Sequence, residues 1–181
     1  MKTNKTKFAI KKQFMKEYSN KKFSLITVKE ICKNTPVART TFYSYFSSLS
    51  EVLEEVEDDI LNGIIDITKN FSNWNHQNID FIDFMNEIEK YIIDNKTYIK
   101  IFLVIQPNFS FINKWKEAIK TNFSKRYPNK ISAKNYEAIS EIMSSTIISM
   151  YTYWMGNFNK SSTKEMKSLL KNMLDTLIKS I

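Results

Sequence analysis

Residues 27–46 read TVKEICKNTPVARTTFYSYF and contain the signals for two short helices joined by a tight turn. Thr27 followed by Glu30 has the spacing of a capping box, which marks the start of a helix. Pro36 ends this helix, because a proline pushes the residue before it out of the helical region. A second short helix is expected over residues 38–46. Together these signals predict a helix-turn-helix.

The start of the second helix carries side chains that are suited to reading DNA. In a DNA-binding helix-turn-helix, the second helix lies in the major groove and its first residues touch base edges. Arginine donates two hydrogen bonds to guanine, threonine bonds a base or meets the thymine methyl group, and alanine allows close approach. Hydroxyl groups nearby can fix the register on phosphates. The predicted DNA-contacting residues are Thr27, Ala38, Arg39, Thr40, Thr41, Tyr43, Ser44 and Tyr45.

The aromatic residues of this stretch have two interpretations. Phe42 and Phe46 are expected in the core of a three-helix bundle, whereas Tyr43 and Tyr45 are expected at the surface. After them, Ser48 and Glu51 form a second capping box, which predicts a long helix over about residues 48–70.

This stretch resembles the helix-turn-helix of the TetR/AcrR-type transcriptional regulators. The resemblance rests on the T-V-x-x-I opening, the V-x-R-x-T-F-Y-x-Y-F recognition helix and the capped helix that follows, and it covers about residues 6–60. It implies a dimeric, sequence-specific DNA-binding regulator, with repression as the expected effect. It further implies a homodimer on a palindromic operator and control by a small molecule in the C-terminal domain.

Three positions depart from the family pattern. Glycine is usual where this chain has Lys22 and Pro36, and a lysine that grips phosphate is usual where it has Leu49. We expect the turn to accommodate Pro36, because the nitrogen at that position need not donate a hydrogen bond. Leu49 removes one expected contact to the DNA backbone and leaves base reading untouched.

Positive charge is concentrated in the first quarter of the chain. The 181 residues include 27 Lys and Arg and 19 Asp and Glu, for a net charge of +8. Residues 1–49 hold 11 of the basic and 2 of the acidic residues, whereas residues 50–181 are nearly balanced. A basic segment beside a near-neutral one favours a polyanion as the partner of the basic part. We therefore expect residues 1–49 to bind DNA, and residues 50–181 to dimerise and sense an effector.

Apolar residues recur at helical spacing along the whole chain. This pattern predicts an all-α protein of about nine helices, in which an N-terminal three-helix bundle precedes a larger helical domain. The expected helices are 6–19, 28–32, 38–46, 48–70, 79–92, 98–105, 111–127, 133–155 and 166–178. Side-chain caps are expected at Thr27, Ser48, Asn78, Asn95, Ser132 and Ser162. The acidic run over residues 54–59 is interpreted as a solvated helix face.

Composition narrows the chemistry. With 2 Gly and 3 Pro, a Gly-rich nucleotide loop and a β-sandwich are not expected. One Cys and one His argue against a metal cluster, and we expect Cys32 to be buried and His76 to lie in a surface loop. The sequence shows no nucleophile–base pair and no phosphate-binding loop, so we expect neither an enzyme nor a cofactor. Without a long apolar run or an export signal, the cytoplasm is the expected location.

Two further sites are predicted in the C-terminal part, each with core packing as the alternative interpretation. An aromatic cluster beside a proline break is typical of a ligand pocket, and its predicted residues are Tyr98, Phe102, Ile105, Gln106, Phe109 and Trp115. Apolar stripes on the last two helices predict a dimer interface built as a four-helix bundle. Its predicted residues are Met143, Ile147, Met150, Tyr151, Trp154, Leu170, Met173 and Leu177.

Two other functions stay open at this point. The same fold could act as a co-regulator that binds another regulatory protein, and Leu49 slightly favours this interpretation. Alternatively, the basic first helix could lie on anionic lipid with an apolar face of Phe8, Ile10, Phe14 and Met15. Preference for one DNA sequence separates the regulator from both alternatives.

Overall fold

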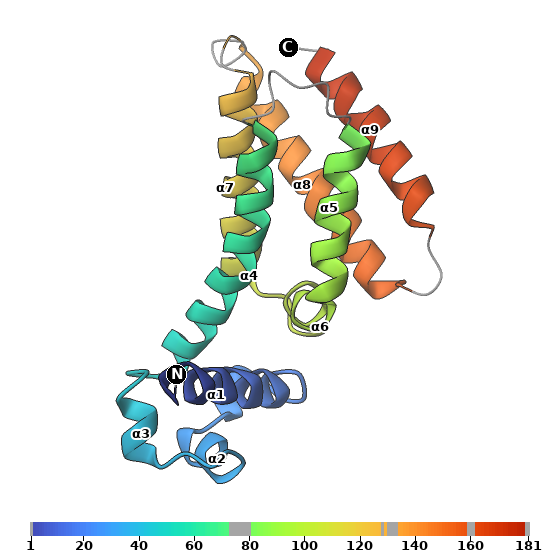
Figure 1. The fold of residues 1–181 in the computed structure, drawn as a ribbon. Coiled ribbons are helices and arrows are strands. Elements are labelled where there is room, and N and C mark those ends of the chain that lie inside the picture. Colours follow the sequence, from blue (N-terminus) through green and yellow to red (C-terminus); the bar gives the residue numbers. More distant parts are fainter. Residues whose placement is uncertain (1, 73–80, 128, 130–133, 159–161, 180–181) are drawn as a thin grey trace. The chain divides into compact units, whose positions relative to one another are not determined.

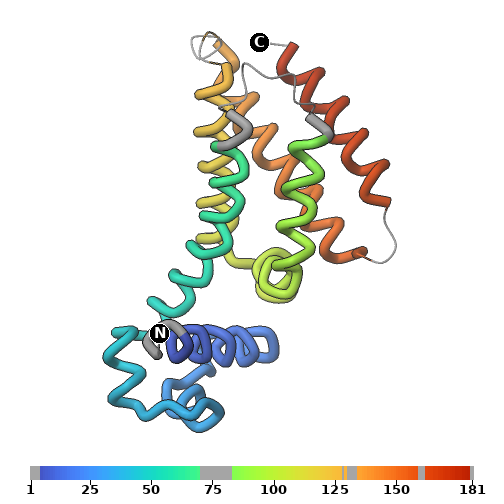
Figure 2. Tube along the Cα trace, viewed as in Figure 1, coloured from blue at the N-terminus to red at the C-terminus, as the bar shows by residue number. Residues whose placement is uncertain are grey.

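The computed structural model describes residues 2–72, 81–127, 129, 134–158 and 162–179. Within this part of the chain there are nine α-helices, two short helical segments of other types and no strand, which confirms the predicted all-α fold. The chain forms two compact units, Met1–Ile60 (unit 1) and Leu61–Ile181 (unit 2), as Figures 1 and 2 show. The long helix α4, Leu49–Ser72, contributes to both units.

Unit 1 is built around one aromatic core. It contains α1 (Lys2–Tyr18), η1 (Phe23–Leu25), α2 (Val28–Lys33), α3 (Arg39–Tyr43) and the first turns of α4. Burying one large apolar side chain stabilises a fold by about 1.5–3 kcal/mol, so this core holds the short helices α2 and α3 in place. The side chains that are at most 1% exposed include Ile10, Phe14, Met15, Ile31, Phe42, Phe46 and Val52.

Ion pairs join α1 to α4 within unit 1. The Lys7 Nζ lies 2.5 Å from the Glu55 carboxylate, and the Lys11 Nζ lies 2.9 Å from Glu55 and 2.7 Å from Asp59. The acidic run is therefore only partly the solvated face that the sequence suggests, because two of its carboxylates face α1 and Glu57 is buried. Burial alone favours a higher pKa for Glu55, but the hydrogen bonds from Lys7 and Lys11 outweigh it and lower the pKa.

These pairs predict that unit 1 loses stability in acid. The pKa of Glu55 in the folded chain lies below its ordinary value of 4.5, so the stabilisation is complete above that value. It is lost as the pH falls through the folded pKa. We expect the midpoint temperature of thermal unfolding to fall less between pH 6 and pH 3 in the Glu55→Gln variant than in the unaltered chain. The matched control is Glu54→Gln, since Glu54 is exposed on the same helix. Equal acid sensitivity of all three proteins would contradict this role for Glu55.

Unit 2 is a helical bundle. It contains the rest of α4, α5 (Phe81–Asp94), α6 (Lys96–Lys100), the π-helix η2 (Ile101–Ile105), α7 (Phe109–Arg126), α8 (Tyr136–Gly156) and α9 (Thr163–Lys179). Helix α8 packs against both α7 and α9, and α9 also contacts α5. In Figure 1 the C-terminal ends of α4, α7 and α9 lie at the same end of this bundle.

Charged side chains fasten these helices to one another. Lys167 on α9 lies 2.5 Å from Glu89 and 2.7 Å from Asn86, both on α5. Glu141 on α8 pairs with Lys116 and Lys120 on α7. The hydrogen bonds from these two lysines lower the pKa of Glu141 to about 2. The carboxylate of Glu141 thus stays ionised through the ordinary pH range.

A glycine allows close approach of α5 to α4. Gly63 lies under the ring of Tyr91, and a Cβ atom at position 63 would overlap that ring. Glycine in the middle of a helix costs about 1 kcal/mol relative to alanine. The position of Tyr91 against α4 offsets this cost.

The side-chain caps agree with the sequence in three places and differ in one. The hydroxyls of Thr27, Ser48 and Ser162 accept from the backbone N–H three residues later, at 3.3, 3.2 and 3.4 Å. Asn95 is the N-cap residue of α6, but its side chain does not cap the helix: its amide donates to the carbonyl of Tyr91, near the end of the preceding helix. Asn108 instead caps α7, with 3.0 Å to the N–H of Phe111. Asn78 and Ser132 lie outside the described residues, as does His76.

Three helix boundaries also differ from expectation. The short helix η1 had no signal in the sequence, α3 ends at Tyr43 rather than at residue 46, and the helix expected over residues 98–105 divides into α6 and η2. A π-helix closes i→i+5 hydrogen bonds, but a single turn of it is too short to change the periodicity of the whole stretch.

Candidate nucleic-acid interface

The turn between α2 and α3 is built without glycine. The Val37 N–H donates to the carbonyl of Thr35 at 2.7 Å, so the chain turns around Pro36 without a bond from its nitrogen. Among the described residues none has a positive φ, and Lys22 lies in an extended conformation at φ −58° and ψ 144°. The two positions where glycine is usual therefore adopt backbone conformations that any residue can reach.

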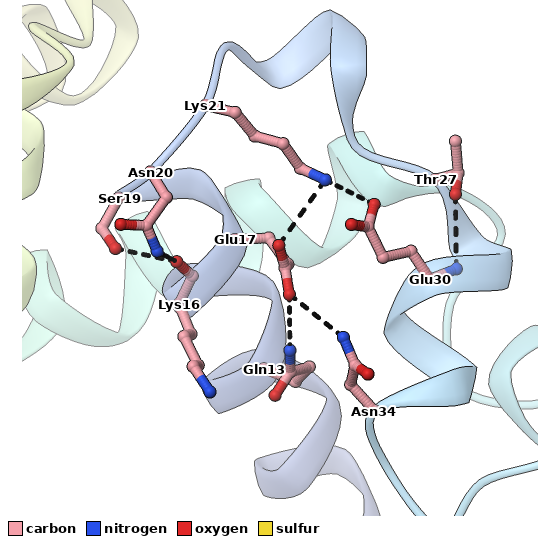
Figure 3. Close-up of polar contacts among 9 residues, drawn as sticks. All are labelled: Gln13, Lys16, Glu17, Ser19, Asn20, Lys21, Thr27, Glu30 and Asn34. Carbon is pink, nitrogen blue, oxygen red and sulfur yellow. Dashed lines mark hydrogen bonds and ion pairs between the residues drawn. The ribbon is translucent and has the colours of Figure 1, made fainter.

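A polar network ties α2 to the end of α1 (Figure 3). The Glu17 carboxylate accepts from Gln13 at 2.7 Å and from Asn34 at 3.3 Å. Lys21 lies 2.5 Å from Glu30 and 3.5 Å from Glu17, and the hydrogen bond to Glu30 raises the pKa of Lys21. Glu30 is in the first turn of α2 and Asn34 is its C-cap. Both ends of α2 are thus fixed to α1, which orients the helix-turn-helix.

Helix α3 has one buried side and one exposed side. Phe42 is fully buried, with its ring 5.4 Å from that of Tyr43 and 5.9 Å from that of Phe46. Positions 39, 40, 43 and 44 follow helical spacing on the other side, where Arg39, Thr40 and Ser44 are exposed and Tyr43 is 57% exposed. Ala38 is exposed just before the helix, and Thr41 and Tyr45 are half-buried. The structure thus places the candidate base-reading residues on an accessible surface.

Two of the candidate hydroxyls already take part in helix capping. The oxygen of Thr27, which is exposed at the start of α2, accepts from Glu30, and its own proton stays available for a phosphate. The Ser44 hydroxyl donates to the carbonyl of Thr41 at 2.8 Å, so it closes α3 and keeps only acceptor capacity. Thr27 therefore suits a phosphate contact better than Ser44 does.

A carboxylate occupies the start of α4. The Glu51 carboxylate accepts from both the hydroxyl and the N–H of Ser47, each at 2.6 Å, and these bonds lower the pKa of Glu51. Leu49, where the family has a lysine, is half-buried as the first residue of the helix. This end of α4 is therefore a poor site for a DNA phosphate, because the Glu51 carboxylate already accepts hydrogen bonds there and would repel a second anion. The capping-box spacing of Ser48 and Glu51 is the feature of the sequence that indicates this carboxylate.

Unit 1 also carries several exposed lysines and one half-buried thiol. Whereas Lys7, Lys11 and Lys21 pair with carboxylates, exposed lysines lie on α1 and α2 and between them: Lys12, Lys16, Lys22, Lys29 and Lys33. Burial raises the pKa of the Cys32 thiol, and the charge of Arg39 partly opposes this. Cys32 is half-buried rather than buried as expected.

Unit 2 contains a partly open cavity of about 240 Å³ among α4, α5, α7, α8 and α9. Of the six predicted pocket residues, Trp115 lines this cavity. Phe102 is fully buried elsewhere, Ile105 and Phe109 are 47% and 77% exposed, and Tyr98 and Gln106 are half-buried. The prediction assumed one continuous helical stripe, whereas the π-helix and the break near Pro107 turn these side chains in different directions.

Most residues predicted for the dimer interface point into unit 2 instead of outward. Four of them are at most 5% exposed: Met143, Tyr151, Trp154 and Leu170. The cavity is lined by Met143, Tyr151 and Leu170 of this group and by Ile147. Met150 and Leu177 are half-buried, and Met173 is 42% exposed. The apolar stripes were identified on the correct helices, but their main role in the structure is packing within the chain. Polar cavity residues such as Asn122, Arg126 and Asp175 carried no signal in the sequence.

Comparisons with known proteins agree with this architecture. The family model for a TetR-type transcriptional regulator C-terminal region matches residues 79–176. The crystal structure of a TetR transcriptional regulator from Streptococcus agalactiae 2603V is similar, with a TM-score of 0.72 and 19% identity, over 96% of this chain and 95% of that chain. The dihydroxyacetone kinase operon activator DhaS matches with a TM-score of 0.61 and 19% identity, over 97% of this chain and 96% of that chain. No curated protein sequence matches.

Proposed function

The chain belongs to the TetR family of transcriptional regulators, and from this premise we propose that it binds an operator as a homodimer through α3. The observation that carries the proposal is the exposed side of α3, where Arg39, Thr40 and Tyr43 are held outward by the burial of Phe42. A dimer would place two such helices about 34–36 Å apart, in successive major grooves on one face of DNA. The exposed lysines of α1 and α2 supply the attraction to phosphate.

Replacing Arg39 with alanine is expected to remove base reading. In fluorescence anisotropy titrations, we expect Arg39→Ala to lose about 1–3 kcal/mol on duplex from upstream of its own gene, with little change on a scrambled duplex. The matched control is Lys164→Ala, because Lys164 is an exposed cation of α9 in unit 2. It removes the same charge away from α3.

Two results of this titration would count against an operator-reading protein. If native and scrambled duplexes bind alike, with steep salt dependence, only a general attraction to polyanions is present. If neither duplex binds, a co-regulator that contacts another protein becomes the better interpretation. A loss for Arg39→Ala that is equal on both duplexes would assign Arg39 to phosphate.

We infer that the dimer surface lies on the exposed sides of α8 and α9, because exposed apolar groups gather there. Ile142 and Tyr153 on α8 are 49% and 60% exposed, and Leu169 and Met173 on α9 are 63% and 42% exposed. An exposed apolar patch on two adjacent helices favours burial against a second copy.

We expect Leu169→Lys to run as a monomer in size-exclusion chromatography with light scattering and to bind operator more weakly. Ser168→Lys is the control for charge, since Ser168 is exposed one residue away.

The lipid-binding alternative loses its apolar face. Ile10, Phe14 and Met15 are at most 1% exposed within unit 1, and only Phe8 of that set is exposed, at 62%. Among the described helices none is long and apolar enough to cross a membrane. We propose that the chain binds DNA rather than lipid and acts in the cytoplasm, where the DNA is.

The direction of regulation depends on where the operator lies. One structural neighbour is an operon activator by name, whereas we propose repression here, with a small molecule in unit 2 changing operator affinity. Such control needs an effector that binds the two conformations with different affinity. A promoter–reporter assay with and without the gene tests this: higher expression without the gene indicates repression.

A further inference from the structure

The cavity of unit 2 has an apolar body and a polar end. Its apolar lining is buried and includes Ile64, Met85, Ile88, Trp115, Tyr151 and Leu170. The rings of Trp115 and Tyr151 are stacked, with centroids 5.4 Å apart and an interplanar angle of 20°. Both residues line the cavity, so an apolar chain can pack against them.

The polar groups of the lining lie towards one end of the bundle. Thr68, Arg126 and Asp175 are in the last turns of α4, α7 and α9. The ends of these three helices lie together in Figure 1. Trp115 is in the first half of α7 and Tyr151 is near the end of α8, which runs in the opposite direction. The aromatic wall is therefore displaced along the bundle from the polar end.

The guanidinium of Arg126 carries five N–H donors, so it can bind a ligand at this end in addition to its contacts within the protein. The amide of Asn122 donates to Thr68 and to the carbonyl of Ala118, each at 2.9 Å, so both of its protons are used inside the protein. Arg126 lies over the ring of Tyr127, 5.9 Å from its centroid. A guanidinium matches a carboxylate in shape and charge, since it can donate two parallel hydrogen bonds.

Charge at this end is of both signs. Among the residues that line the cavity, Arg126 is the cation and Asp175 is the anion. The Asp175 side chain is 52% exposed and lies 3.9 Å from Lys171 of the same helix, so water and this lysine both screen its charge. An anionic head at Arg126 is thus opposed only weakly by Asp175, whereas a cationic head would meet Arg126 directly.

We propose that this cavity binds a small amphiphile with a carboxylate head, its chain against Trp115 and Tyr151 and its head at Arg126. The volume of about 240 Å³ holds on the order of eight groups the size of a water molecule, at roughly 30 Å³ each. A chain of about eight carbons is therefore the expected length. The inference rests on the proposed small-molecule control, and it names the class of that effector.

Calorimetry on the full chain without DNA tests the ligand class independently of operator binding. We expect octanoate to bind more tightly than octan-1-ol, and octylamine to bind weakest. Arg126→Gln is expected to weaken octanoate about tenfold or more, as for a charge-assisted hydrogen bond. Lys125→Gln is the matched control, because Lys125 is the exposed neighbouring cation. Asp175→Asn is expected to tighten octanoate.

The possible results distinguish the role of the carboxylate head group from that of the apolar chain, and ligand binding from operator binding. Equal binding of octanoate and octan-1-ol, or equal loss in the Arg126 and Lys125 variants, would overturn the carboxylate assignment. Absence of octanoate binding would overturn the proposal as a whole, even if operator binding is intact. Should Arg126→Gln fail to fold by circular dichroism, Asp175→Asn and Ala118→Leu, which narrows the cavity, provide the test. Unchanged octanoate affinity in both of these variants would equally overturn it.

Discussion

The Phe42→Ala variant is expected to lose about 3–5 kcal/mol of unfolding free energy, as is usual when a buried phenylalanine is truncated. Phe42 is fully buried where α3 meets the core of unit 1, in contact with the ring of Phe46. Helices α2 and α3 have 6 and 5 residues, and helices this short are not stable without tertiary packing. Loss of this ring therefore removes the support of the whole helix-turn-helix.

The measurement compares two probes of urea unfolding at one protein concentration. Far-UV circular dichroism follows both units, whereas tryptophan fluorescence follows unit 2, because the three Trp residues at positions 74, 115 and 154 are all there. We expect Phe42→Ala to move part of the circular dichroism transition to lower urea and to leave the fluorescence transition in place. The Phe42→Ala variant should also lose binding to both the native and the scrambled duplex.

Tyr43→Ala is the matched control for this experiment. Tyr43 is the neighbouring aromatic residue on α3 and is 57% exposed, so its truncation should change stability by less than about 1 kcal/mol. It should still weaken DNA binding if its hydroxyl contacts phosphate. Equal destabilisation by the two variants would show that the core of unit 1 does not depend on Phe42.

Local signals in the sequence predicted unit 1 well. The capping hydroxyls of Thr27 and Ser48 and the proline of the turn act within four residues, so their geometry follows from spacing alone. The buried positions of Phe42 and Phe46 follow from the period of a helix. In contrast, the pairing of Lys7 with Glu55 and of Lys11 with Asp59 joins residues 48 positions apart. Such contacts depend on how α1 packs on α4, which periodicity does not specify.

Unit 2 shows where periodicity stops being informative. An apolar stripe states that one side of a helix is buried, but it does not say whether its partner is the same chain, a second copy or a ligand. The stripes that contain Tyr151 and Leu170 predicted a dimer interface with core packing as the alternative, and in the structure both residues line the cavity. Arg126 has no signal in the sequence, because a single charged residue at the end of a helix forms no pattern. Its position at the cavity depends on the tertiary packing that brings the C-terminal ends of α4, α7 and α9 together.

The Trp115→Ala variant is expected to have the second large effect, about 3–5 kcal/mol of unfolding free energy in unit 2. Trp115 is 2% exposed, stacks on Tyr151 and meets Phe111 edge-on at 5.7 Å between centroids. Its removal deletes apolar contacts on α7 and α8 together and enlarges the cavity that the ring borders. Neighbouring side chains can refill the space only in part, so a cavity cost adds to the lost burial.

Urea unfolding followed by the remaining tryptophans measures this effect, with Phe109→Ala as the control. Phe109 begins the same helix but is 77% exposed, so its truncation should change stability by about 0.5 kcal/mol or less. A larger cavity should also accept a longer chain, so we expect Trp115→Ala to favour decanoate over octanoate relative to the unaltered protein. If Trp115→Ala is no less stable than Phe109→Ala, the stacked pair does not support the bundle. If the variant is less stable but its chain-length preference is unchanged, Trp115 supports the bundle without setting the depth of the site.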